Sequence, residues 1–270
     1  MQKKFYPSFG QALVILLYGL LAGFAGAPLF VLYIIWKNSY TYAIGNIGIY
    51  LAAFIIPTGW AIKHIKRSGD SFSLAQLFSR KMNFLQVVYL ILLTIALSIC
   101  IDYLVKLLHL PNFFSAEIDS MLEISWLGFI ALVILPAFFE EVLLRGVILH
   151  QFLKMYSARS AILLSAILFG VMHINPSQVL AGFIAGCFLG WVYLKTKNIK
   201  YCILVHFVNN GLAWMSFELD RHFHHDPITT FVTTQDTNLP AFCITLVILI
   251  TGIGLLNKFY NIQPLADQSA

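Results

Sequence analysis

Residues 126–149 read WLGFIALVILPAFFEEVLLRGVIL, an apolar run that carries two glutamates and one arginine. The run is long enough to cross a bilayer, whose hydrocarbon core of about 30 Å needs roughly 20 helical residues. Charged side chains are costly inside that core and are uncommon in spanning helices unless they serve a function. The segment therefore predicts a transmembrane helix with a polar site inside the membrane.

The whole chain has the same apolar character. Of its 270 residues, 59% are hydrophobic and 11% are charged, whereas soluble domains contain about 25% charged residues. This composition excludes a soluble globular enzyme, a disordered chain and a small disulfide scaffold. The alternation typical of membrane strands is absent from the sequence, so the predicted fold class is an all-α polytopic membrane bundle.

Eight apolar runs are candidates for spanning helices. They are residues 10–36, 43–62, 84–101, 126–149, 161–174, 176–194, 201–217 and 239–256. The fifth run is short, about 21 Å as a helix, and the first imitates a signal peptide but is long enough that we expect it to be retained. We divide the chain into three helices at 1–125, a core of four at 126–217, and the last helix with its flanking segments at 218–270.

Lysine and arginine between these runs predict the orientation, because short cytoplasmic loops accumulate both residues. The chain has 17 lysines and arginines, and Arg145 is the one that lies inside a run. With the N-terminus inside, Lys37, Lys106 and Arg221 fall on the outer side, and the remaining thirteen fall on the inner side. Both termini are thus expected to be cytoplasmic, at the inner membrane if the source is bacterial. This bias accounts for the net charge of +5, and nucleic-acid binding is not expected.

The polar side chains inside the runs are concentrated in the core: they are Glu140, Glu141, Arg145, His173, His206 and Asn210. Glu141 and Arg145 are four residues apart, so they share one helix face and can pair. Glu140 is rotated by about 100° from that face. With no cation beside it, Glu140 should hold its proton more tightly, which suits a general base near neutral pH.

The two histidines have different neighbours. His206 and Asn210 are also four residues apart, and together they could donate hydrogen bonds to a developing oxyanion. His173 lies near the end of the fifth run, two residues before Asn175 and Pro176, which we expect to break the helix. It could act with Glu140 in holding and deprotonating a water molecule.

These residues resemble the three motifs of the CPBP intramembrane proteases, the family of the type II CAAX prenyl endopeptidases and the Abi proteins. The motifs occur in order on consecutive apolar runs as Glu140-Glu141-x-x-x-Arg145, Phe169-x-x-x-His173 and His206-x-x-x-Asn210. The resemblance implies an eight-helix fold, peptide-bond hydrolysis by an activated water, and a cavity reached from the cytoplasmic side.

The resemblance also implies a role for each motif residue. Glu140 and His173 would activate the water. His206 and Asn210 would stabilise the oxyanion, and the pair Glu141 and Arg145 would support the site. The implied partners are the lipid bilayer and a membrane-associated peptide or protein substrate, lipidated and CAAX-like in one branch of the family.

A metal-dependent mechanism stays open. Glu140, His173 and His206 offer the donors that catalytic zinc uses, and another divalent metal is also conceivable. The sequence HExxH is absent, and no carboxylate is evident as a partner of either histidine. A mechanism that needs no cofactor is therefore our first expectation.

Other functions are also compatible with buried charges. The same residues could carry protons or ions in a coupled transporter, although no paired inverted repeats are evident in the sequence. A membrane scaffold or a self-immunity protein without proteolytic activity could have the same fold. Hydrolysis of a lipidated peptide by the purified protein distinguishes the enzyme from these alternatives.

Overall fold

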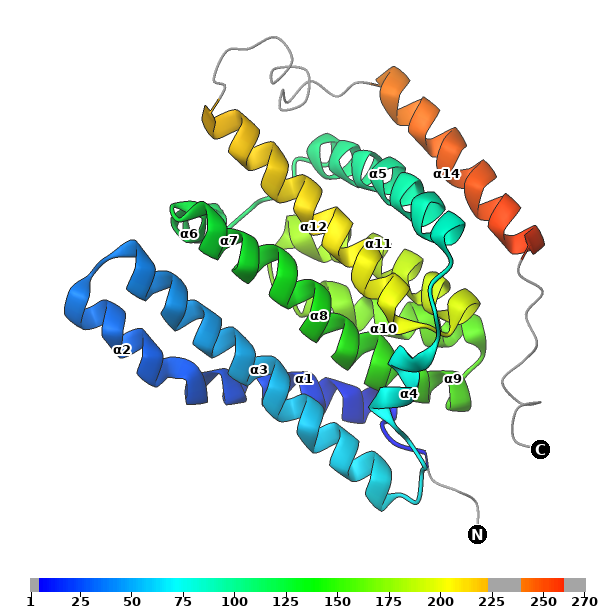
Figure 1. Cartoon of the computed structure of the whole chain (residues 1–270), viewed down its shortest axis with the longest axis horizontal. Coiled ribbons are helices and arrows are strands. Elements are labelled where there is room, and N and C mark those ends of the chain that lie inside the picture. The colour runs from blue at the N-terminus through cyan, green and yellow to red at the C-terminus, as the bar shows by residue number, and fades with distance from the viewer. Residues whose placement is uncertain (1–4, 223–238, 260–270) are drawn as a thin grey trace.

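The computed structural model describes residues 5–222 and 239–259, which form a bundle of helices with no strand among them (Figure 1). Five helices in this part of the chain are long and apolar enough to cross a membrane: Phe9–Trp36, Ser39–Arg67, Phe84–Leu107, Ser125–Met155 and Pro176–Thr196. Shorter apolar helices cover Ala158–Val171 and Leu239–Leu255. The prediction of an all-α integral membrane bundle is confirmed.

The first predicted span is divided in two. Helix α1 (Phe9–Gly23) is followed by the 3₁₀ turn η1 (Phe24–Gly26) and by α2 (Ala27–Trp36), which has Pro28 in its first turn. Both helices pack against α3 (Ser39–Arg67), and Figure 1 shows the three together at one edge of the bundle. A Cβ atom on Gly26 would lie 2.3 Å from the carbonyl oxygen of Gly48, so this contact requires glycine.

A second group of helices lies on the other side of the bundle. The short helix α4 (Leu74–Ser79) leads into α5 (Phe84–Leu107), which packs between α12 (Ile199–His222) and α14 (Leu239–Phe259) (Figure 1). The hydroxyl of Tyr89 on α5 donates to the carbonyl of Gly252 on α14 at 2.8 Å. A further short helix, α6 (Ser115–Leu122), precedes the central helix.

The central helix is continuous but irregular. It consists of α7 (Ser125–Phe129), η2 (Ile130–Ile134), α8 (Leu135–Glu141), η3 (Val142–Leu149) and α9 (His150–Met155), and both η2 and η3 are π-helical. The sequence predicts a helix that Pro136 bends just before Glu140, but it does not predict the π-helical turns. Proline at position 136 has no N–H to donate to the carbonyl of Leu132, which favours a departure from α-geometry before it. Because π-helical turns are frequent at functional sites, their position on both sides of α8 draws attention to Glu140 and Glu141.

Helices α10 (Ala158–Val171) and α11 (Pro176–Thr196) form a close hairpin. A Cβ atom on Gly170 would lie 2.7 Å from the carbonyl oxygen of Val179, and one on Gly186 would lie 2.9 Å from Cα of Ala166. Small residues allow the two backbones to approach this closely, as they do between membrane helices in general. The hairpin supplies one wall of the site described below.

Contacts between connecting segments show which of them share an end of the bundle. At one end Lys154 pairs with Asp70 at 2.8 Å, and Arg80 Nη1 donates to the carbonyl of Thr196 at 3.4 Å. At the other end Arg221 Nη1 donates to the carbonyl of Leu122 at 3.2 Å. The segments predicted to be rich in cations therefore meet at a single end, and which face of the membrane that end occupies stays a prediction.

Candidate active site

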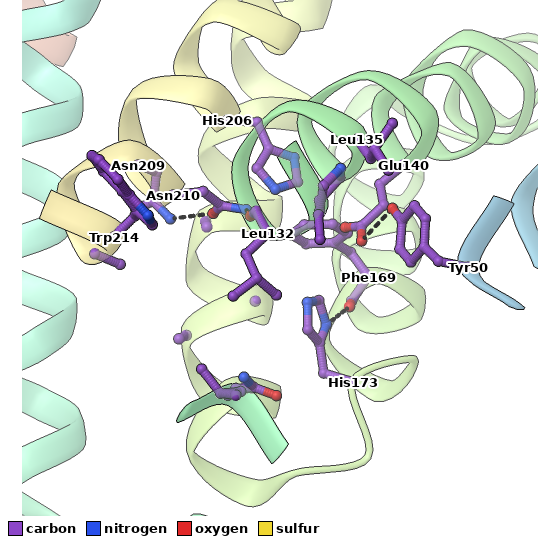
Figure 2. A pocket seen from close by; sticks show the side chains of 18 of the residues that line it. Tyr50, Leu132, Leu135, Glu140, Phe169, His173, His206, Asn209, Asn210 and Trp214 are labelled. Atoms are coloured by element: carbon purple, nitrogen blue, oxygen red, sulfur yellow. Dashed lines mark hydrogen bonds between the residues drawn. The ribbon is translucent and has the colours of Figure 1, made fainter. Parts of the chain in front are cut away.

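A cavity of about 810 Å³ lies among α3, α5, α6, α8, α10, α11 and α12. Its lining includes Glu140, His173, His206 and Asn210, which are the four residues predicted to be catalytic (Figure 2). Straight α-helices through the fourth and fifth runs would place Glu140 and His173 at depths that differ by about 9 Å. In the irregular central helix both residues nevertheless reach the same cavity.

Glu140 is buried at the wall of the cavity, with 5% of its surface exposed. Its Oε1 accepts a hydrogen bond of 3.0 Å from the hydroxyl of Tyr50, and Figure 2 shows Tyr50 approaching from α3. Its Oε2 has no hydrogen-bond partner within the protein. One carboxylate oxygen is thus held in place while the other has no partner in the protein.

The adjacent Glu141 has a different environment. Its Oε1 lies 2.8 Å from Nη1 of Arg145, and both side chains are completely buried. Arg145 also donates from Nη2 to the carbonyl of Gly186 at 3.3 Å, and its guanidinium carbon lies 4.3 Å from the centroid of the Phe169 ring. The ion pair expected from the spacing is present, and it is further stabilised by contacts from α10 and α11.

His206 is held by the same carboxylate. Its Nδ1 lies 2.9 Å from Oε1 of Glu141. Since a carboxylate accepts, Nδ1 carries a hydrogen, and in the neutral ring Nε2 then has a lone pair. The sequence-based statement that neither histidine has a carboxylate partner is wrong for His206, because Glu141 can serve Arg145 and His206 at once.

His173 lies half-buried at the end of α10, and Figure 2 shows its hydrogen bond to the backbone of Phe169. Its Nδ1 is 2.8 Å from that carbonyl oxygen, which can only accept, so Nε2 of the neutral ring is free to accept a hydrogen bond. A Cβ atom on Gly182 would lie 3.3 Å from Nδ1 of His173. Glycine at this position of α11 therefore leaves room for the imidazole ring.

The turn after His173 is strained and firmly anchored. Ile174 has a φ of 61°, in the left-handed region that β-branched residues rarely adopt. Asn175 is fully buried, and its side chain accepts from the N–H of Phe113 at 3.1 Å and donates to Oδ1 of Asn112 at 2.7 Å. These bonds to the segment before α6 hold the turn in place, a role that the sequence-based view of Asn175 as a helix break did not include.

Asn210 contacts the irregular part of the central helix. Its Nδ2 donates to the carbonyl of Leu132 at 2.9 Å, which is the carbonyl that Pro136 cannot serve in an α-helix. The amide of Asn209 donates to Oδ1 of Asn210 at 3.2 Å, and the hydroxyl of Ser98 lies 2.9 Å from Oδ1 of Asn209. One amide hydrogen of Asn210 is therefore engaged in fixing the segment before α8, in addition to any contact with a substrate.

Phe169 lies at the centre of the polar groups. Its ring is in edge-on contact with His173, at a centroid distance of 5.3 Å, and with His206, at 5.6 Å, while Arg145 lies over it. In the sequence Phe169 is only one letter of its motif, and no role is predicted for it. The position of Phe169 in the same motif as His173 was the one feature of the sequence that could have indicated a role for this ring.

The predicted metal ligands do not form a ligand cluster. Among residues 5–222 and 239–259, no three His, Cys, Asp or Glu side chains lie close enough together to hold a metal ion. Nδ1 of His173 and Nδ1 of His206 are each engaged by other protein groups, which leaves Nε2 as the nitrogen that either ring could offer to a water or a metal. In this arrangement Glu140, His173 and His206 are not close enough together to share one ion.

The lining of the cavity is not spread evenly along the bundle. Beyond the motif residues, its lining includes Ile118 and Met121 of α6, and Trp214 and Phe217 in the second half of α12. These elements belong to the end of the bundle that is poor in cations. The lining thus extends toward the cation-poor end, and the access from the cation-rich side that the resemblance implies stays a prediction.

Residues 122–212 match the family described as type II CAAX prenyl endopeptidase Rce1-like. Over these residues the chain is similar to the CPBP/CAAX protease family, and we call them the CAAX protease segment. The CAAX protease segment contains all three motifs, and the family is one of membrane peptidases that act on membrane-associated protein or peptide substrates. No curated protein and no solved structure matches the chain significantly.

Proposed function

We propose that the protein is an intramembrane endopeptidase in which Glu140 and His173 activate a water molecule that attacks a substrate peptide bond. The observation that supports this most strongly is the presence of all four motif side chains in one buried cavity, with Oε2 of Glu140 unpartnered. Water held between that oxygen and Nε2 of His173 would have a base on one side and an acceptor on the other.

The chemical steps follow from these groups. Glu140 takes a proton from the water while the water oxygen attacks the carbonyl carbon of the substrate. The resulting oxyanion accepts hydrogen bonds from His206 and Asn210. Collapse of the tetrahedral intermediate breaks the C–N bond, and the proton on Glu140 passes to the departing amine.

His206 can donate to the oxyanion from Nε2 only when both of its ring nitrogens carry a proton. The carboxylate of Glu141 at Nδ1 would then act as a counter-charge for the imidazolium. Arg145 shares that carboxylate, so the three residues form one buried network behind the oxyanion site. The supporting role of Glu141 and Arg145 is exerted in this proposal through His206.

The lining of the cavity favours an apolar substrate. Apart from the polar residues described above, its walls consist mainly of aliphatic and aromatic side chains such as Leu97, Phe188 and Trp214. Pockets of this kind bind apolar groups, and a few polar residues fix the orientation. A lipidated, CAAX-like peptide fits this composition, because its lipid would contact the walls while the peptide bond reaches Glu140.

The proposal is tested with purified protein in liposomes and a fluorogenic lipidated peptide. We expect Glu140→Gln to abolish cleavage while expression and thermal stability stay near those of the wild type, because the shape is kept and the base is lost. Glu123→Gln, at an exposed glutamate before α7, is the matched control and should cleave normally. Undiminished cleavage by Glu140→Gln would overturn the assignment of the base.

Metal dependence is tested separately. If Glu140 and His173 activate the water unaided, extensive chelation followed by elemental analysis should leave a zinc-free enzyme with full activity. Activity that is lost on chelation and restored by stoichiometric zinc would make Glu140, His173 and His206 the ligands.

A further inference from the structure

Tyr50 contacts Glu140 from outside the CAAX protease segment. It lies in the first half of α3, and its hydroxyl is 3.0 Å from Oε1 of Glu140. The six polar motif residues all come from residues 122–212. Tyr50 thus adds to the site a polar group for which no motif provides a signal.

The other cavity-lining positions of α3 do not offer such a group to Glu140. Ile47, Ile49 and Ala53 are apolar, and the amide nitrogen of Asn46 donates to the carbonyl of Tyr42 within the helix. The ring of Tyr50 packs against Phe54 at a centroid distance of 4.6 Å, which restrains its orientation. The hydroxyl is therefore presented to Glu140 by a side chain with little freedom.

The chemistry of the contact bears on the function of the base. A phenol can donate to a carboxylate oxygen, and such charge-assisted hydrogen bonds are stronger than neutral ones. This bond restrains rotation of the carboxylate and occupies Oε1, whereas Oε2 is left without a protein partner. The arrangement selects one of the two oxygens for the water.

We propose that Tyr50 is a positioning residue for the general base Glu140. It orients the carboxylate so that Oε2 meets the water, and it does not itself contact the scissile bond. The inference rests on the proposed function. It makes catalysis depend on the placement of α3, and hence on the unit of α1, α2 and α3, although these helices carry no family motif.

The test is Tyr50→Phe, which removes a single oxygen atom. Misplacement of a reacting group can lower the rate by on the order of 100-fold, so we expect a loss of about 10-fold to 100-fold in kcat with KM changed less than about twofold. Tyr89→Phe is the matched control, because Tyr89 is also half-buried and donates to a backbone carbonyl, that of Gly252. It loses a comparable hydrogen bond and should keep the wild-type kcat.

A wild-type kcat for Tyr50→Phe, or an equal loss for Tyr89→Phe, would overturn the inference while leaving the proposed function intact. If the wild-type protein cleaves no peptide, the proposed function fails and the contact is tested without activity. A double-mutant cycle in thermal stability then combines Tyr50→Phe with Glu140→Leu. If the stability changes of the two single variants do not sum to that of the double variant, the contact is supported. Strictly additive stability changes refute the contact.

Discussion

Replacing Glu141 with glutamine removes a carboxylate that contacts two other buried groups. Arg145 Nη1 lies 2.8 Å and His206 Nδ1 lies 2.9 Å from the same oxygen, and both Glu141 and Arg145 are fully buried. Breaking a buried ion pair by removing one partner costs about 3 to 5 kcal/mol, because the remaining charge is uncompensated. At about 2 to 4 °C per kcal/mol for a chain of this size, the thermal midpoint should fall by about 6 to 20 °C.

The substitution should also affect turnover. On spacing alone Glu141 serves Arg145, and folded Glu141→Gln protein would be expected to keep its activity. Because His206 uses the same oxygen, the variant also loses the group that orients this ring, and misplacement of the ring should lower kcat about 10-fold to 100-fold. The double variant Glu141→Gln with Arg145→Gln should recover part of the stability, since the uncompensated cation is gone, but not the turnover.

The assay combines thermal unfolding in detergent with peptide cleavage normalised to folded protein. Glu218→Gln, at a glutamate near the end of α12, serves as the control for loss of a carboxylate away from Arg145. A Glu141→Gln variant with wild-type stability would refute the buried-pair argument. Wild-type turnover in the folded fraction would refute the link from Glu141 to His206.

Further predictions concern the strained turn, a buried cation and the orientation. Ile174→Gly should raise stability by roughly 1 kcal/mol, because glycine relieves the left-handed strain and the residue replaced is 63% exposed. Ile174→Ala keeps the strain and should show no gain in thermal midpoint. Burial and a neighbouring arginine lower the pKa of Lys197 from 10.5 to about 8. Between those pH values the folded chain therefore binds fewer protons than the unfolded chain, so stability should rise with pH across this window. Thermal scans of Lys197→Met should show no such rise. They should also show a gain in stability of about 1 to 2 kcal/mol at pH 7. Single cysteines at Ser68 and Ser157 should be protected from an impermeant thiol reagent in intact cells, and one at Thr234, outside the described residues, should be labelled; the reverse pattern would contradict the predicted orientation.

Five of the eight predicted spans coincide with helices long and apolar enough to cross a membrane, because hydrocarbon thickness fixes a minimum length for an apolar run. The π-helical turns could not be predicted. The π-helical segment Ile130–Ile134 is accompanied by a hydrogen bond from Asn210 to the carbonyl of Leu132. These two residues are 78 positions apart in the sequence, so no local pattern predicts their contact. The interruption between α1 and α2 was indicated only by Pro28, within a run that is apolar on both sides.

The candidate site was predicted from the cost of burying charges and from motif order. Spacing on a helix correctly related Glu141 to Arg145, because both belong to one local segment. Contacts between segments were inaccessible to that reasoning, so the sharing of Glu141 with His206 and the approach of Tyr50 to Glu140 were missed. Tyrosines are ordinary in membrane helices, and nothing in the sequence distinguishes Tyr50 from the others.

The close hairpin of α10 and α11 has a consequence for biosynthesis. As a helix of 14 residues, α10 measures about 21 Å and is too short to integrate into a bilayer of about 30 Å by itself. Its partner follows after a turn of four residues and approaches it through Gly170 and Gly186. The two helices should therefore leave the translocon as one unit, and enlarging either glycine should hinder the insertion of α10 before the active site can assemble.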